Sequence, residues 1–426
     1  MKILLSGLSY LLLAQSLYAL SDYRCSDKSL CEICEYKDVS SINEAFTEGR
    51  VDGQIRLAYI NQDNHETSVP GTYATSIGGQ LKYETAKLYH VSLAVSAFVS
   101  QRISGLSGDK DKGELNPDFF GEDYASFVYM GEAYVDYEYE KMNFRVGRQK
   151  LDTPLNDRDD IRMLPNTFEA AMAGYGGIVD TVLVAGYVTR WAGYDSGEDI
   201  SKFKDLPGEV ETTGENGKGM FLFGVMNESL DNIELQAWYY DFDKLAGVLY
   251  MDAIYGAEYE SGLDVEFGVQ FGNYAQKSSS KTEGDVYGGI LGIGYEGLVL
   301  GVAGNYVDTG HDENIILGYG GGPYFTSMEE MTINAINDAK AYVLFSELDF
   351  SKILMDGLSL SYAYGHFKGY DLGVNIKYDE HDVILSYEAS EEVNIEASYA
   401  SVNDQTRSGA FDTGYDRFLV RANYNF

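Results

Sequence analysis

The 426-residue chain is poor in cations, histidine and long apolar segments, and each shortage excludes a class of protein. Lys and Arg number 31 against 67 Asp and Glu, which gives a net charge of −36. This excess opposes nucleic-acid binding and favours attraction of cations. After residue 19, no stretch approaches the roughly twenty apolar residues of a membrane helix. The five histidines are dispersed, and no nucleophile-elbow or phosphate-loop motif is present. We therefore expect neither an enzyme nor a protein that holds a metal or a cofactor.

The N-terminus has the pattern of a secretory signal. Residues 1–19 begin with one cation, Lys2, continue with an apolar run over 3–13 and end on the small residue Ala19. We predict that this segment is cleaved after export. A retained membrane anchor is the alternative, but the apolar run is too short to span a bilayer as a helix.

Residues 20–48 are expected to form a short periplasmic lead-in. All three cysteines of the chain lie here: Cys25, Cys31 and Cys34. In an oxidising compartment they allow one disulfide, with Cys31 and Cys34 as the candidate pair, and one leftover thiol. Ser41 and Glu44 have the spacing of a capping box, which predicts one short helix over 42–48.

The remainder, residues 49–426, has the alternation of β-strands. Tyr (36), Phe (20) and Gly (47) are abundant, and the last nine residues place aromatic or apolar residues on one face and Arg421, Asn423 and Asn425 on the other. The same pattern occurs in 51–59, 129–139, 233–239, 265–271 and 393–399. In 129–139 the apolar face is predicted to carry Tyr129 and Val135. One face suits lipid and the other suits water, which is typical of a transmembrane barrel.

The connections support an antiparallel barrel of about 18 strands, an even number as in bacterial outer-membrane barrels. Six long connections are found near 63–71, 102–125, 151–165, 191–218, 308–340 and 403–415, and short turns lie between them. All six prolines fall in these long connections, a restriction that a soluble sandwich or propeller would not produce. Whether 372–386 is one strand or two stays open. Closure requires strand 418–426 to pair with 51–59, because no backbone edge can remain in hydrocarbon.

One long connection has the composition of a pore constriction. Between Pro154 and Pro165 it packs charges of both signs, and proline stiffens each end. A rigid segment folded into the lumen could hold opposed charges across a narrow gap. A surface loop with internal ion pairs is the alternative. The candidate constriction residues are Arg148, Asp157, Arg158, Asp159, Asp160 and Arg162.

The same region resembles a known family. Gly147-Arg148-Gln149, then Leu-Asp-Thr-Pro at 151–154, then Arg162-Met163-Leu164-Pro165-Asn166-Thr167-Phe168-Glu169 is similar to the signature of the OprD family of substrate-specific outer-membrane porins. Residues 42–59 resemble the start of that family's mature domain. In layout the resemblance extends from about residue 42 to 426. It implies an eighteen-stranded barrel, monomeric or loosely trimeric, narrowed by inward-folded loops and passing small, often carboxylate-bearing solutes along a row of lumenal arginines.

Strand parity supplies candidates for the lumen wall. The basic row would comprise Arg56, Arg145 and Arg421, and the acidic residues would be Asp52, Glu132, Asp136, Glu234, Glu266 and Glu396. Arginines opposite acids would favour zwitterions, whereas lumenal acids alone would favour simple cations. The chain is far more acidic than an anion channel, and the cysteine-containing lead-in has no counterpart in the family pattern.

The sequence thus predicts a passive, moderately selective channel in the outer membrane of a Gram-negative bacterium. Its expected partners are membrane lipid, lipopolysaccharide, small hydrophilic solutes and the barrel-assembly machinery, which would read the C-terminal strand. A non-conducting structural or adhesive barrel and, less favoured, a barrel hydrolase are the alternatives. A hydrolase would need a Ser/His or Asp/His cluster, which the sequence does not show.

Overall fold

The computed structural model describes residues 38–197, 199–210, 214–310, 313–334, 336–371, 374–406 and 412–426. The predicted signal over 1–19 and the three cysteines lie outside these residues. Within them, no helix is long and apolar enough to cross a membrane.

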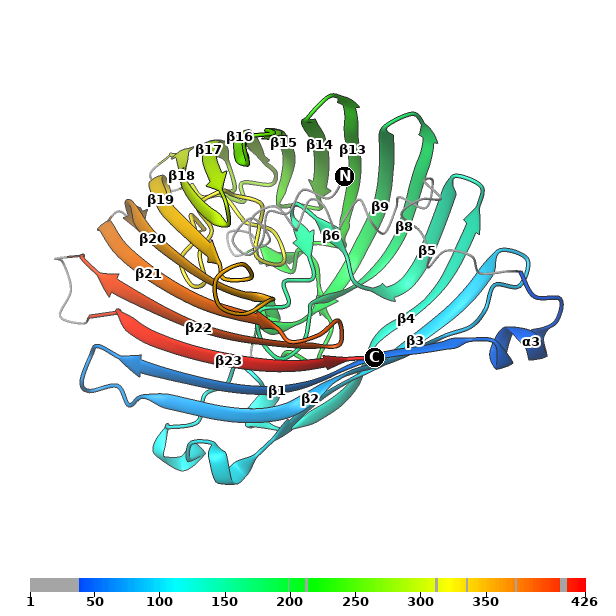
Figure 1. Cartoon of the computed structure of the whole chain (residues 1–426), viewed down its shortest axis with the longest axis horizontal. Helices are drawn as coiled ribbons and strands as arrows, with labels where there is room; N and C mark the ends of the chain where they lie inside the picture. The colour runs from blue at the N-terminus through cyan, green and yellow to red at the C-terminus, as the bar shows by residue number, and fades with distance from the viewer. Residues whose placement is uncertain are drawn as a thin grey trace.

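Eighteen long antiparallel strands form a closed barrel, in which each strand pairs with its sequence neighbour and the last pairs with the first (Figure 1). The strands are β1 (Arg50–Asn64), β2 (Thr72–Glu84), β3 (Val91–Arg102), β4 (Phe127–Tyr139), β5 (Met142–Gln149), β8 (Thr167–Ile178), β9 (Thr181–Ala192), β13 (Met220–Leu230), β14 (Ile233–Phe242), β15 (Ala246–Glu258), β16 (Leu263–Gln276), β17 (Gly284–Tyr295), β18 (Leu298–Asp308), β19 (Asn337–Asp349), β20 (Leu358–Asp371), β21 (Val374–Glu388), β22 (Val393–Asp404) and β23 (Tyr415–Asn425). The predicted fold class is confirmed, and the open question over 372–386 is answered by the single strand β21.

Short elements occupy the connections. They are the strands β6 (Asp152–Thr153), β7 (Asn156–Asp157), β10 (Lys204–Asp205), β11 (Glu209–Val210) and β12 (Glu215–Asn216), and the 3-10 turns η1 (Ser104–Leu106), η2 (Lys110–Lys112), η3 (Glu122–Tyr124) and η4 (Tyr194–Ser196). The six long connections all lie at one end of the barrel, here called the loop end, and contain all six prolines as predicted. The same end also carries the shorter connections 243–245 and 277–283, so connections at this end are not uniformly long.

The predicted helix is α3 (Ile42–Thr47), which lies beyond the ring of strands (Figure 1). Ser41 caps it by accepting the backbone N–H of Glu44 through its hydroxyl at 3.2 Å. The Glu44 carboxylate accepts from the backbone and hydroxyl of Ser40, at 2.9 Å each, rather than from Ser41. The capping box is therefore completed one residue earlier than the sequence pattern indicates.

The barrel closes through strand β23, which pairs with β1 in the register Arg56↔Asn423 and Tyr59↔Val420. The backbone N–H of Gly53 donates to the carbonyl of Phe426 at 2.8 Å, and that of Phe426 donates to Gly53 at 3.0 Å. Closure by these two strands was predicted and is confirmed. No backbone edge remains between them, which a barrel in hydrocarbon requires.

Alternation places exposed apolar side chains on the outside of the wall and polar side chains inside. On β1, Val51, Ile55 and Leu57 are exposed, whereas Arg56 between them is only 2% exposed. The prediction is wrong at Tyr129. In the pairing of β3 with β4, Ser96 faces Glu132 and Ala97 faces Met130, so Gly131 forms a bulge. The extra residue reverses the parity beyond it, and Tyr129 packs against the buried Phe98 with ring centroids 5.5 Å apart.

We predict that Gly79→Ala destabilises the barrel by roughly 1–3 kcal/mol, because Gly79 has a φ of +125°, a conformation that costs any other residue about that much. Its added Cβ would also lie 1.9 Å from the carbonyl oxygen of Gln54. The measurement is the urea midpoint of unfolding in lipid vesicles. Gly176→Ala on β8, where nothing lies within 4 Å of the added Cβ, is the matched control and should leave the midpoint nearly unchanged. Equal midpoints for the two variants would contradict this account.

Candidate functional site

Segment 150–166, which joins β5 to β8, is bound to the interior side of the strands that close the barrel. The guanidinium of Arg56 donates to both carboxylate oxygens of Asp160, at 2.6 and 2.8 Å. It also donates to Asn423 Oδ1 at 2.6 Å and to the carbonyl of Arg162 at 2.8 Å. Bidentate pairing to a carboxylate fixes both distance and orientation. Arg56 therefore joins β1, β23 and the segment at one point.

Arg421 extends this arrangement along β23. Its guanidinium donates to the carbonyl of Asp160 and to the carboxylate of Glu396 on β22. We call Arg56, Asp160, Glu396, Arg421 and Asn423 the closing cluster. Burial raises the pKa of Asp160, but the neighbouring Arg56 outweighs this effect and holds that pKa below its ordinary value. The Asp160 carboxylate thus stays ionised, and the pairing persists, at neutral pH.

A second ionic group, the loop cluster, joins three long connections and comprises Asp118, Arg162, Glu330 and Arg417. Arg162 binds Glu330 at 2.9 Å and Asp118 at 3.4 Å. Arg417, from β23, binds the same two acids at 2.7 and 3.5 Å. Asp118 lies in segment 103–126 and Glu330 in segment 309–336. All four side chains are at most 10% exposed, so removing one partner would leave a buried charge unpaired.

Apolar packing also holds segment 150–166 inside the barrel, where its hairpin β6–β7 lies (Figure 1). Leu151 and Leu155 are buried in the same apolar cluster as three stacked aromatic residues of β14, namely Trp238, Tyr240 and Phe242. Met163 and Leu164 are buried against Phe98, Phe119 and Phe120. Each such aliphatic side chain contributes about 1.5–3 kcal/mol on burial. The segment is therefore fixed by apolar contacts as well as by charge.

Segment 309–336 is paired with the hairpin through its backbone. The N–H of Tyr319 donates to the carbonyl of Leu155 at 2.8 Å. The N–H of Asp157 donates to the carbonyl of Tyr319 at 3.2 Å. The buried carboxylate of Asp157 accepts from the N–H groups of Gly321 and Gly322, at 3.4 Å each. Gly320 and Gly322 have φ values of +138° and +77°, which explains the glycine-rich sequence here.

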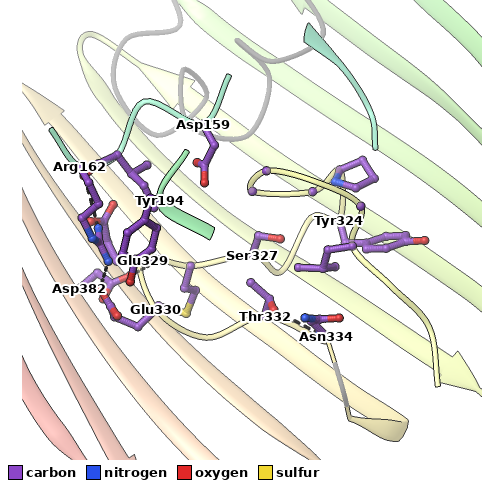
Figure 2. Close-up of a pocket in the computed structure, with 18 of the residues that line it drawn as sticks. Asp159, Arg162, Tyr194, Tyr324, Ser327, Glu329, Glu330, Thr332, Asn334 and Asp382 are labelled. Atoms are coloured by element: carbon purple, nitrogen blue, oxygen red, sulfur yellow. Dashed lines mark hydrogen bonds and ion pairs between the residues drawn. The ribbon is translucent and has the colours of Figure 1, made fainter. Parts of the chain in front are cut away.

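A cavity of about 610 Å³ lies between these segments and the wall. It is lined by Asp159, Ile161, Arg162, Trp191, Tyr194, most of 317–334 and residues of β19, β20 and β21. Figure 2 shows Arg162, Glu329, Glu330 and Asp382 at one side of this space, with Tyr324 at the other. This volume lies in the range of pockets that hold small molecules.

Several residues singled out from the sequence meet here. Arg56, Asp160, Glu396 and Arg421 belong to the closing cluster, Arg162 belongs to the loop cluster, and Asp159 lines the cavity. Asp157 binds segment 309–336, and Arg158 pairs with Asp152 within its own segment.

Arg148 lies elsewhere. It pairs with Ala133 and Glu169, two residues after Val146, whose exposed side chain faces outward. Its guanidinium contacts Glu169 at 3.0 Å and lies 4.2 Å from the ring of Phe203. By its register Arg148 shares the outward parity of Val146, and its guanidinium lies beside Glu169 and Phe203 rather than at the constriction predicted for it.

The other wall residues are separate from both clusters. Arg145 pairs with Asp136 at 2.8 Å, Glu132 lies 3.9 Å from Lys150, and Asp52 binds Arg50 at 3.0 Å. Glu234 and Glu266 lie on β14 and β16. Each of the three arginines predicted for the basic row is bound to an acid.

Sequence reasoning missed Asp118, Glu330, Arg417, Glu380 and Asp382. Arg417 has the same parity as Arg421 and directly precedes residues 418–426. Extending the alternation of that strand by one residue would have found it. Glu380 and Asp382 share the inward face of β21, and both are buried. Asp118 and Glu330 lie in long loops, where no periodicity indicates facing. In the residues that the structure describes, no group of three or more His, Cys, Asp or Glu could hold a metal ion.

Comparison with solved structures identifies similar barrels among outer-membrane porins. OccAB2 of Acinetobacter baumannii superposes with a TM-score of 0.77 at 16% identity, covering 90% of this chain and 99% of that one. A BenF-like porin from Pseudomonas fluorescens Pf-5 gives 0.77 at 14% identity, over 90% and 100% of the two chains. The chain has the fold of OprD-type porins. OpdK of Pseudomonas aeruginosa, solved with vanillate, gives 0.75 at 16% identity, over 89% and 99%.

The OprD-type fold implied by the sequence resemblance is therefore confirmed. No protein-family model and no curated protein sequence matches the chain. At 14–16% identity these solved structures show the fold of the barrel and leave its solute open.

We predict that the packing of the β6–β7 hairpin depends on Asp157. Burial, with the nearby Asp152, raises the pKa of Asp157 from 3.8 to about 7. The folded protein holds this proton more tightly than the unfolded chain does. The contribution of Asp157 to the free energy of unfolding is therefore fully present below about pH 4 and is lost as the pH rises through about 7. Hydrogen exchange of 150–166 should accordingly increase between about pH 5 and pH 8, after correction for intrinsic rates. Asp157→Asn should remove this pH dependence. Asp160→Asn is the control and should keep it, because the Asp160 carboxylate of the wild type stays ionised over this pH range. A dependence that survives in Asp157→Asn would assign it to another group.

Proposed function

We propose that this chain is an outer-membrane porin through which small hydrophilic solutes diffuse passively, with moderate selectivity, along a lumen narrowed by segments 150–166 and 309–336. The observation that carries the proposal is the attachment of these segments to the interior wall by the closing and loop clusters, beside a cavity of about 610 Å³. Fixed charges of both signs at a constriction select solutes by charge and orientation. Apolar residues cover the exterior, which suits contact with lipid.

The charge balance of the clusters favours cations over anions. Four arginines and four acids pair in the two clusters, so no arginine of either cluster is left over to bind an anionic solute. The net charge of −36 acts in the same direction at the pore mouths. We infer a preference for cationic or zwitterionic solutes.

The same proposal includes the setting of the barrel. We propose the outer membrane of a Gram-negative bacterium, with lipid and lipopolysaccharide around the exterior and recognition of the last strand, ending at Phe426, by the barrel-assembly machinery. A monomer or a loose homotrimer would serve. A structural or adhesive barrel, and a barrel hydrolase, are the competing functions. Ion conductance after reconstitution distinguishes a porin from a structural or adhesive barrel. The absence of turnover on lipid or peptide substrates distinguishes it from a barrel hydrolase.

We predict that the purified barrel conducts ions in planar bilayers and that Arg162→Ala changes its conductance. Loss of Arg162 leaves Glu330 and Asp118 with Arg417 alone, so segment 309–336 loosens, and the unitary conductance and open-channel noise should rise. Arg158→Ala is the matched control, because Arg158 pairs with Asp152 inside its own segment. The change in Arg158→Ala should be clearly smaller. Identical currents for both variants and the wild type would remove the constriction from the proposal, and strong anion selectivity in asymmetric KCl would remove the cation preference.

A further inference from the structure

Three lysines form a row on the outside of the barrel wall. Lys340 of β19 is paired with Lys368 of β20, and Lys368 is paired with Lys377 of β21, in three strands that lie side by side (Figure 1). Residues that are paired across neighbouring strands share one face of the sheet. All three lysine side chains are exposed, whereas Phe367, next to Lys368, is buried on the inner side. We call Lys340, Lys368 and Lys377 the lysine row.

The ammonium groups of the lysine row have no acidic partner. None of them forms a hydrogen bond or an ion pair with the part of the chain that the structure describes, and Lys340 lies over the ring of Tyr306 with its Nζ 5.3 Å from the ring centre. The acids Asp308 and Asp379 share this face without pairing with the row, and the carboxylate of Asp379 lies 2.6 Å from His366 Nδ1. Like charges directly opposite each other destabilise a sheet. An anion from outside the chain would therefore be favoured here.

The lysine row lies at one limit of the band that faces lipid. Between it and the opposite ends of β19, β20 and β21, at Asp349, Leu358 and Glu388, the chain advances by nine, ten and eleven residues. A tilted strand needs about 9–11 residues to cross the hydrocarbon core. The outward side chains in between are mostly aromatic or aliphatic, and the exposed ones include Tyr342, Leu344, Leu360, Tyr362, Val383 and Leu385. The ammonium groups thus lie at the level where acyl chains end and headgroups begin, in the leaflet at the loop end.

A lipid phosphate fits this position better than a soluble anion does. Neighbouring strands are about 4.8 Å apart, so the row spans about 10 Å and can contact a headgroup that carries more than one phosphate. The acyl chains of such a lipid would lie along the apolar side chains that follow the row toward the other end of the barrel. A free phosphate ion would gain nothing from these side chains.

We propose that the lysine row binds the phosphate groups of lipopolysaccharide in the leaflet at the loop end, with the acyl chains against Tyr342, Leu344 and Tyr362. Charge complementarity selects the headgroup, and the apolar surface next to the row selects a lipid over a soluble ion. This inference rests on the proposed outer-membrane setting and assigns one of its partners, lipopolysaccharide, to a defined surface of the barrel.

Binding of fluorescently labelled lipopolysaccharide to the full-length barrel in a nonionic detergent, measured by fluorescence anisotropy, tests the proposal. Lys340→Gln, Lys368→Gln and Lys377→Gln should each weaken binding about fivefold, and the triple variant should weaken it on the order of a hundredfold, since each lysine close to an anionic lipid surface contributes about a factor of five. Lipopolysaccharide without its phosphates should bind the wild type and the triple variant equally and weakly.

Two further variants assign the effect to the position of the charges. Lys110→Gln, Lys202→Gln and Lys244→Gln combined remove the same charge from the loop end, but an acid of the chain already binds each of these lysines. Their combination is the matched control and should change binding less than about twofold. Lys340→Arg, Lys368→Arg and Lys377→Arg combined keep the charge and should preserve binding. Equal weakening in the row and control triple variants, unchanged binding after removal of the phosphates, or displacement by millimolar inorganic phosphate would overturn the proposal.

Conductance in planar bilayers of phosphatidylcholine tests the porin function separately. The lysine row lies outside the lumen, so the triple glutamine variant should conduct as the wild type does, which also shows that it is folded. Phosphate-dependent binding without conductance in the wild type would uphold the lipid site and refute the porin function. Conductance without such binding would refute the lipid site and leave the porin function in place.

Discussion

The buried guanidinium of Arg56 is the interaction on which the arrangement inside the barrel depends. It lies on the inner face of the first strand, is 2% exposed, and forms four hydrogen bonds to groups on the last strand and on segment 150–166. A charge that is removed from water needs such complete pairing, because the desolvation cost of an unpaired ion is several kcal/mol. The need to satisfy one arginine therefore links barrel closure to the position of the segment that narrows the interior.

The membrane sets the constraint on the outside of the same strands. In hydrocarbon every backbone group must be bound within the barrel, and a charged side chain costs about 2–4 kcal/mol at mid-depth. The strands answer with an alternation that is broken at bulges such as Gly131, and large apolar side chains predominate on the exterior. In the interior, arginines of the wall pair with acids of the wall and of the loops. The apolar exterior and the ion-paired interior are thus two faces of one alternating pattern.

The fold was largely predictable because its signals are periodic. Alternation located Arg56 and Arg421 on inner faces and indicated that their strands are neighbours, which the register Arg56↔Asn423 confirms. Prediction failed at Tyr129, where the bulge at Gly131 inserts one residue that no pattern of apolar and polar residues reveals. The position of Arg148 follows from its register, two residues after the outward-facing Val146, rather than from the composition that assigned it to the constriction.

The candidate site was less predictable than the wall. Composition marked segment 150–166 as unusual, yet its partners Asp118 and Glu330 lie in loops, about 44 residues before and 168 residues after Arg162, where tertiary packing alone decides contacts. The glycines of 318–322 were a usable signal, because a run with positive φ values indicates a backbone that approaches another chain segment closely. Loop-to-loop pairing has no period, so sequence parity could not supply it.

The contacts of Arg56 also bear on the order of assembly. Asn423, one of its partners, lies 367 residues away along the chain, and Asp160 lies 104 residues away. Contacts of such sequence separation form late, because long loops must close before the contacts can be made. Arg421 and Arg417 arrive with the same final strand, so neither ionic cluster can be complete while the barrel is still an open sheet. The attachment of segment 150–166 to the closing strands is consequently a product of the last step of folding, and an incompletely closed barrel would leave Arg56 and Asp160 without their partners on the final strand.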